Sequence, residues 1–136
     1  MSNSVNKLFS ADSSKKTDGL VQTQREAIVD LLHYCMYADN FVALAEDRFV
    51  NSVAATLSWD KNISFEVYEG GSIGKARKAK ESAAFRETFY KDVVHRLATK
   101  EARSLALQLC KDLYNADTGM VNAESQQLAM LHKMLA

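Results

Sequence analysis

The sequence predicts an all-α fold, a single domain of six or seven helices that contains a pseudo-symmetric pair of helix-turn-helix units. Three observations lead to this prediction. Apolar residues recur at three- and four-residue spacing along most of the chain, and no stretch sustains the alternation of a strand. The 136 residues include no proline, so helices are seldom interrupted. An acidic turn also occurs twice, once in each half of the chain.

The N-terminal segment, residues 1–20, is rich in Ser, Asn, Asp and Lys and predicts a flexible tail, so the helical domain is expected over 21–136. The first helix is predicted from about Gln22, with enough apolar residues to pack on more than one side. Its apolar positions are Ile28, Leu31, Leu32, Tyr34, Cys35, Met36 and Tyr37. Its polar positions, expected mostly away from the apolar face, are Gln24, Arg25, Glu26 and Asp30. A second helix is predicted from about Leu44 to Asp60.

The middle of the chain has the least regular pattern. Ser64 is suited to cap a short helical run that begins at Phe65. Residues 69–74 contain three glycines and predict a loop. The next segment, 75–81, is predicted to form a basic helical stretch with little apolar face.

Three amphipathic helices are predicted to complete the domain. The first carries Phe85, Phe89, Val93 and Leu97 on one face. Thr99 can cap the second, which continues to about Leu113. Asn122 can cap the last, whose apolar positions are Leu128, Leu131 and Leu135.

The duplicated acidic turn suggests a metal site. Asp39 follows the first helix and Glu46 comes seven residues later, and Asp117 and Glu124 repeat this spacing. Such oxygen donors suit hard divalent cations, calcium above all, so these four residues are the predicted ligands. An alternative stays open, because Asp in a turn bonds local backbone and Glu in a first turn favours the helix dipole. The second turn is not an EF-hand, since Leu128 stands where the last ligand, Glu, would be required.

A basic segment follows the glycines. Residues 75–103 contain nine Lys or Arg and four Asp or Glu. The chain has zero net charge, so the rest of it is correspondingly acidic. The candidate surface for a partner protein or an anionic membrane consists of Lys75, Arg77, Lys78 and Lys80. A solvated helix face is the commoner explanation of such a run. The glycines at 70–74 do not make a nucleotide-binding loop, because their spacing is one residue short and Ala76 replaces the required Ser or Thr.

No combination of residues marks a catalytic site, so the chain is predicted not to be an enzyme. The three histidines share no zinc-binding pattern with cysteines. Cys35 and Cys110 lie within apolar helical patterns and are expected to be buried free thiols.

The zero net charge gives no support to nucleic-acid binding. Without a secretory signal or an apolar run of membrane-spanning length, a soluble cytoplasmic protein is expected.

The order and duplication of these motifs resemble the tellurite-resistance TerB-like family over about residues 22–135. The family's acidic turn is matched by 38–42 (Ala-Asp-Asn-Phe-Val), with Glu46 and Asp47 in the following helical turn. The second copy, 116–121, has its glycine and its hydrophobic residue one position late. Two further segments, 64–67 and 101–106, are also similar to the family.

The resemblance implies an all-helical, pseudo-symmetric, non-enzymatic domain that acts in stress responses such as tellurite resistance. It implies that the acidic turns bind or sense a divalent cation. It also implies interaction with other proteins of a membrane-associated complex. The expected location is therefore cytoplasmic and peripheral to the membrane, and no specific nucleic acid is expected as a partner. The alternative function is a metal-independent structural adaptor that docks a partner or a membrane surface through the basic face at 75–80.

Overall fold

The computed structural model describes residues 19–37, 44–115 and 122–135; for 44–47 and 122–125 it describes the helical backbone and not the side chains. Within these ranges it contains six helices and no strand, which confirms the all-α class. The predicted tail lies almost wholly outside the described residues. The helices are α1 (Gln22–Met36), α2 (Leu44–Thr56), α3 (Phe65–Glu81), α4 (Ala83–Leu97), α5 (Lys100–Tyr114) and α6 (Asn122–Leu135).

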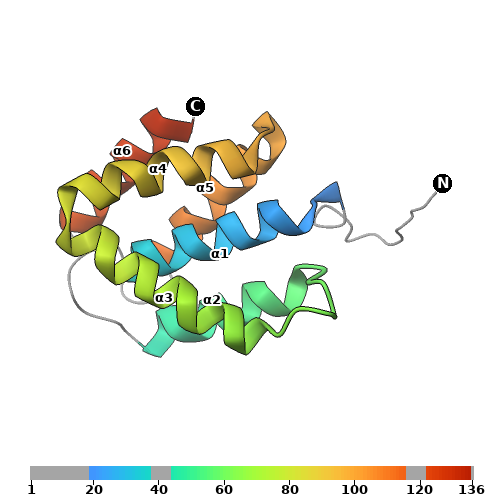
Figure 1. Ribbon diagram of the computed structural model, residues 1–136. Helices are drawn as coiled ribbons and strands as arrows, with labels where there is room; N and C mark the ends of the chain where they lie inside the picture. Colours follow the sequence, from blue (N-terminus) through green and yellow to red (C-terminus); the bar gives the residue numbers. More distant parts are fainter. Residues whose placement is uncertain (1–18, 38–43, 116–121, 136) are drawn as a thin grey trace.

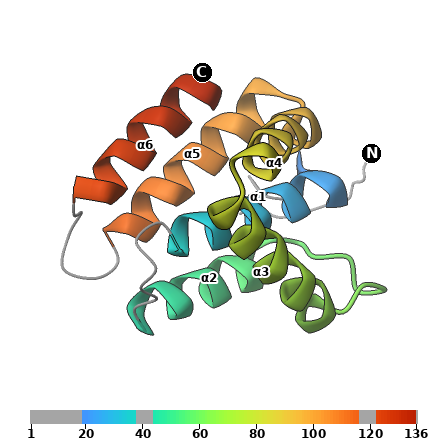
Figure 2. The ribbon, with the colours of Figure 1, turned by 60° about the vertical axis from the view of Figure 1, so that its left-hand side comes forward.

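Helix α1 is the centre of the molecule. It contacts α2, α3, α4 and α5, and in Figures 1 and 2 it lies between α2 and α3 on one side and α4 and α5 on the other. Every residue from Ala27 to Met36 is buried. A helix that is buried all round must be apolar all round or must pair its polar groups. The prediction that this helix packs on more than one side is confirmed.

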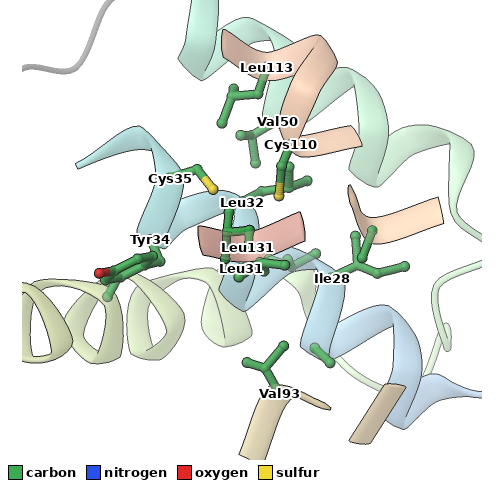
Figure 3. Packing of buried hydrophobic residues seen from close by; sticks show 14 of the residues in the cluster. Ile28, Leu31, Leu32, Tyr34, Cys35, Val50, Val93, Cys110, Leu113 and Leu131 are labelled. Carbon is green, nitrogen blue, oxygen red and sulfur yellow. The ribbon is translucent and has the colours of Figure 1, made fainter. Parts of the chain in front are cut away.

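The hydrophobic core forms where α1 meets its neighbours. Ile28, Leu31 and Leu32 of α1 are fully buried, and Figure 3 shows them among side chains contributed by four other helices. These side chains are Val50 of α2, Val93 of α4, Cys110 and Leu113 of α5, and Leu131 of α6. Helix α6 reaches the core from the outside, packed against α5.

Side-chain caps fix where the helices begin. Ser64 accepts a hydrogen bond from the backbone N–H of Val67 and caps α3, and Thr99 accepts one from Ala102 and caps α5, as predicted. Ser82 caps α4 in the same way, and as the single residue between α3 and α4 it forms the sharp joint between them. The predicted cap Asn122 is the first residue of α6, and its side chain lies outside the described part of the chain.

The predicted loop at residues 69–74 is wrong, because α3 continues through all three glycines. Glycine destabilises a helix interior by about 1 kcal/mol relative to alanine, but packing can outweigh this cost. Here the same helix buries Ser72, Ala76 and Ala79 against the rest of the domain. Arg86 of α4 also donates hydrogen bonds to the carbonyl oxygens of Ala79 and Lys80, near the end of α3.

Candidate functional site

The C-terminal ends of α1 and α5 lie next to each other at one end of the bundle. The two helices are in contact, and close to their ends the thiol of Cys110 forms a hydrogen bond with Cys35. Figures 1 and 2 show α2 and α6 beginning at this same end. We call it the acidic end, defined by the C-terminal ends of α1 and α5 and the first turns of α2 and α6. In both helix pairs, α1–α2 and α5–α6, the first helix therefore ends and the second begins at this end of the molecule.

The two cysteines lie beneath the acidic end. Cys35 is 1% exposed and Cys110 is fully buried, and neither forms a disulfide, so the prediction of buried free thiols is confirmed. The hydrogen bond with Cys35, together with burial, raises the pKa of the Cys110 thiol well above its usual value. A thiol that stays protonated is a poor nucleophile and a poor metal ligand. The pair therefore serves packing between α1 and α5.

The side chains of the four predicted metal ligands are outside what the structure describes. Asp39 and Asp117 lie in the undescribed connections 38–43 and 116–121. Glu46 and Glu124 are each the third residue of a helix, α2 and α6, and their side chains are not described. Among the side chains that are described, no group of three His, Cys, Asp or Glu could hold a metal ion. The four-carboxylate site therefore stays a prediction.

The four residues of the predicted basic face make different contacts. Lys75 turns toward α1, where its ammonium group lies 2.6 Å from Asp30. The guanidinium group of Arg77 lies over the ring of Tyr37, and the ammonium group of Lys78 lies over the ring of Phe85. Lys80 is partly buried and also has an interaction partner. Only Arg77 and Lys78 are exposed, and the docking role of this face stays a prediction.

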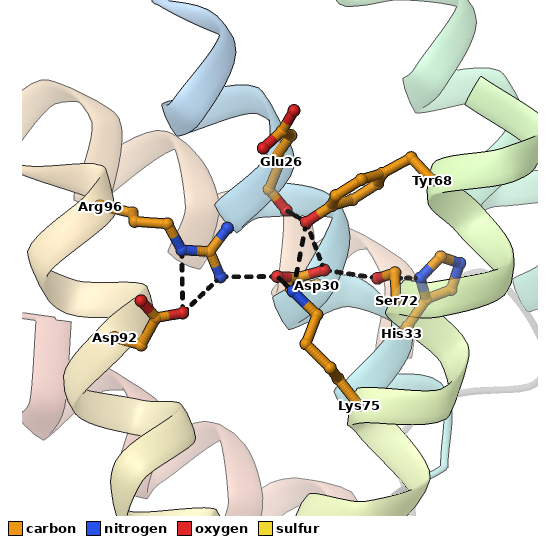
Figure 4. Close-up of polar contacts among 8 residues, drawn as sticks. All are labelled: Glu26, Asp30, His33, Tyr68, Ser72, Lys75, Asp92 and Arg96. Carbon is orange, nitrogen blue, oxygen red and sulfur yellow. Dashed lines mark hydrogen bonds and ion pairs between the residues drawn. The ribbon is translucent and has the colours of Figure 1, made fainter. Parts of the chain in front are cut away.

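A buried polar network joins α1 to α3 and α4 around the carboxylate of Asp30 (Figure 4). Asp30 is fully buried, although the sequence pattern assigned it to a polar face, and that prediction is wrong. One carboxylate oxygen accepts hydrogen bonds from Tyr68 at 2.8 Å and Ser72 at 2.6 Å. The other accepts from Lys75 and Arg96, each at 2.6 Å. Four donors on two oxygens satisfy this carboxylate.

The charges of the network hold Asp30 ionised. Burial alone would raise the pKa of the Asp30 carboxyl group, but hydrogen bonds from Lys75 and Ser72 and the positive charge of Arg96 outweigh burial and lower it below its ordinary value of 3.8. Burial and the Asp30 charge raise the pKa of Tyr68, so its hydroxyl stays a donor. For Arg96, burial lowers the pKa, but Asp30 and Asp92 outweigh it and keep the guanidinium group charged.

One chain of polar contacts has the order of a nucleophile, a base and an acid, as in a catalytic triad. It consists of Ser72, His33 and Glu69. Nδ1 of His33 lies 2.8 Å from the hydroxyl oxygen of Ser72, and Nε2 lies 3.6 Å from the Glu69 carboxylate. Ser72 is fully buried and donates its only hydroxyl proton to Asp30, so His33 donates to Ser72 rather than accepting from it. This arrangement neither exposes nor activates a nucleophile. It extends the network from Ser72 to His33 of α1 and Glu69 of α3.

Sequence reasoning missed this network because it treated Asp30 as a surface residue. The signal was present: apolar residues occupy every face of the helix between Ala27 and Met36, so a carboxylate among them had to be buried and paired. The basic excess at 75–103 contains both of its cationic partners, Lys75 and Arg96. The spacing of residues in the sequence did not identify which of the nine Lys and Arg residues at 75–103 would pair with Asp30.

Comparisons of the chain with known protein families, with curated proteins and with solved structures find no match. Among the helices of the described chain, none combines the length and the apolar character needed to cross a membrane.

Proposed function

We propose that this domain is a non-enzymatic module that binds a divalent cation, calcium by preference, at its acidic end. The ligands are Asp39 and Glu46 of one hairpin and Asp117 and Glu124 of the other. One observation supports the proposal: α1 and α5 pack side by side and end together, and in the sequence each is followed by one copy of the acidic turn. A shared cation site would explain why both copies of the turn keep the same seven-residue spacing between Asp and Glu.

The chemistry of these residues supports a hard cation. Carboxylate oxygens are the usual protein ligands of calcium and magnesium, and calcium accepts six to eight of them with flexible geometry. The negative ends of two helix dipoles, those of α1 and α5, lie at the same end and add to the attraction for a cation. The Asp30 network ties α1 to α3 and α4, which gives one half of the proposed site a rigid support.

The resemblance to TerB-like domains supports a role in responses to chemical stress, such as tellurite resistance, within an assembly of partner proteins at the membrane. We propose that the α1–α2 and α5–α6 hairpins are the two related halves that this resemblance implies. The competing proposal is the metal-independent adaptor with its basic face at 75–80. It is less favoured, because Lys75 pairs with Asp30 and the other three cations of this face also make contacts within the domain.

Calorimetric titration of the full chain with calcium, magnesium, manganese and zinc tests the proposal. We expect saturable binding of calcium, weaker binding of magnesium, and a rise in melting temperature with calcium. At a calcium concentration about 100 times the Kd, the stabilisation should be about 2.7 kcal/mol. The double variant Asp39→Asn with Asp117→Asn should fold normally and lose both the heat and the rise in melting temperature.

A matched control removes the same charge from the opposite ends of the same helices. Glu26→Gln with Glu101→Gln changes the N-terminal half of α1 and the first turn of α5; Glu101 lies about 20 Å from the C-terminal end of α5, since a helix rises 1.5 Å per residue. This variant should bind calcium as the wild type does. If no ion produces heat and the melting temperature is unchanged by each of them, the cation proposal is wrong and the adaptor proposal gains support.

A further inference from the structure

A groove of about 560 Å³ lies between α4 and α6, on the outer side of α5. Both flanking helices pack on α5, and Figure 2 shows them on either side of it. The apolar part of the groove is formed by Tyr90 and Val94 of α4 and by Met130 and Met134 of α6. Met130 is 38% exposed, one of the few large apolar side chains of the described chain that face solvent to this extent. An apolar surface of this kind, set between two helices, is a common site of partner binding.

Positive charge surrounds this apolar surface. Three cationic residues line the groove, Lys91 of α4, Arg103 of α5 and Lys133 of α6; His95 lies beside them, and Glu87 is the one acidic residue of the lining. Lys91 and Lys133 are exposed, and neither takes part in any ion pair formed by the described residues. The two lysines lie on opposite walls of the groove, which suits an elongated anionic partner better than a single small anion.

Arg103 adds a buried donor at the side of the groove. One of its terminal nitrogens donates a hydrogen bond to the carbonyl oxygen of Val94 at 3.3 Å. Its Nε is buried and has no partner among the described residues. A buried guanidinium N–H without an acceptor is costly, so a partner that brings a carboxylate to this edge gains a charge-assisted contact if the side chain shifts.

We propose that this groove binds an acidic amphipathic helix of a partner protein. The α4 wall extends from Glu87 to His95, about 12 Å or two helical turns, which matches the apolar stripe of a short helix. Leucine-sized anchors at three- and four-residue spacing would fill the space between Tyr90 and Met130. Flanking carboxylates would meet Lys91 and Lys133. The two methionines, being unbranched and polarizable, can adapt to such anchors.

The test uses two designed peptides of about 14 residues, long enough for about four helical turns. Both carry the same leucine stripe, one with glutamate and the other with lysine at the flanking positions. We expect the glutamate peptide to bind the full chain and to shift the methyl NMR signals of Met130 and Met134. The lysine peptide should bind about tenfold more weakly, since like charges replace attractive pairs on both walls.

Charge reversal supplies the decisive comparison. Lys91→Glu with Lys133→Glu should weaken binding of the glutamate peptide about tenfold and strengthen binding of the lysine peptide, a gain that misfolding cannot produce. The control variant Arg48→Glu with Lys61→Glu makes the same charge change on exposed residues outside the groove, and should leave both affinities unchanged.

Three outcomes would overturn the proposal. The first is that the glutamate peptide leaves the Met130 and Met134 methyl signals unmoved, or binds the charge-reversed variant as tightly as the wild type. The second is that dilution of the protein alone shifts those methyl signals, which would identify a second copy of the chain as the occupant. The third is that Phe9→Ala shifts them without any peptide, which would identify the chain's own N-terminal segment instead.

Discussion

Asp30 is the residue on which the packing of three helices depends. A buried carboxylate costs several kcal/mol in lost hydration, and only good geometry with further hydrogen bonds offsets this. Here Lys75 comes from α3 and Arg96 from α4, while Tyr68 and Ser72 add two neutral donors. Each partner fixes a helix in place relative to α1. Removing the carboxylate charge would leave both cations without their buried partner.

Asp30→Asn should therefore destabilise the domain by about 3–5 kcal/mol at neutral pH, the usual result of breaking a buried ion pair on one side. Denaturant unfolding followed by circular dichroism measures this. Asp92→Asn is the control, because Asp92 also pairs with Arg96 but is 49% exposed. That change should cost less than about 1 kcal/mol. An equal loss of unfolding free energy in the two variants would show that the buried carboxylate of Asp30 contributes no more to stability than the exposed one of Asp92.

The same substitution has a pH signature. The pKa of Asp30 is lowered in the folded state, so its contribution to stability is fully present above the unfolded value and is lost as the pH falls through the folded value. The difference in unfolding free energy between the wild type and Asp30→Asn should be constant near neutral pH. It should begin to shrink below about pH 4, where the Asp30 carboxyl group of the unfolded wild-type chain takes up a proton while that of the folded state stays ionised. A difference that grows at acid pH would contradict the assigned network.

At the scale of the element, α3 shows where local sequence signals and packing disagree. Three glycines within six residues predicted a loop, yet the helix continues through them. The same helix presents Ser72 and Lys75 to Asp30, and Ser64 caps its beginning. Local propensity is a weak guide where tertiary contacts of this strength exist. The caps Ser64 and Thr99 were predictable because they depend only on neighbouring residues.

Gly71 and Gly74 give a test of this helix. Both are exposed, and an added Cβ would meet no atom within 4 Å at either position. Gly71→Ala and Gly74→Ala should each stabilise the domain by about 0.5–1 kcal/mol, because alanine reduces the entropy lost on forming the helix. Gly71→Pro should destabilise it by about 3 kcal/mol. Thermal unfolding measures all three, and a proline tolerated at 71 would restore the loop predicted from sequence.

At the scale of the whole molecule, the all-helical class, the buried cysteines and the central position of α1 followed from hydrophobic spacing alone. The Asp30 network did not, because spacing shows that a charge lies within an apolar helix but not which distant cation meets it. The groove between α4 and α6 also depends on how separate helices pack. The proposed cation site differs again: its motif is clear in the sequence, and Asp39 and Asp117 lie outside the described residues.

The two hairpins share one core through α1 and α5, so they should unfold together. Leu131 of α6 is fully buried, and Leu131→Ala should cost about 2–5 kcal/mol. Trp59, the one tryptophan, reports on a different region, since it packs against Phe65 and Tyr68 beside α2 and α3. Its fluorescence midpoint in guanidinium should fall by the same amount as the midpoint from circular dichroism.

Met130→Ala is the control for this experiment, because Met130 lies on the same helix and is 38% exposed. It should shift both midpoints far less than Leu131→Ala does, since little buried surface is lost. Separate midpoints in Leu131→Ala, with Trp59 reporting the wild-type value, would mean that α6 detaches alone. Coincident midpoints mean instead that a change in α6 lowers the stability of the opposite hairpin by the same amount, as expected if the two hairpins share one core through α1.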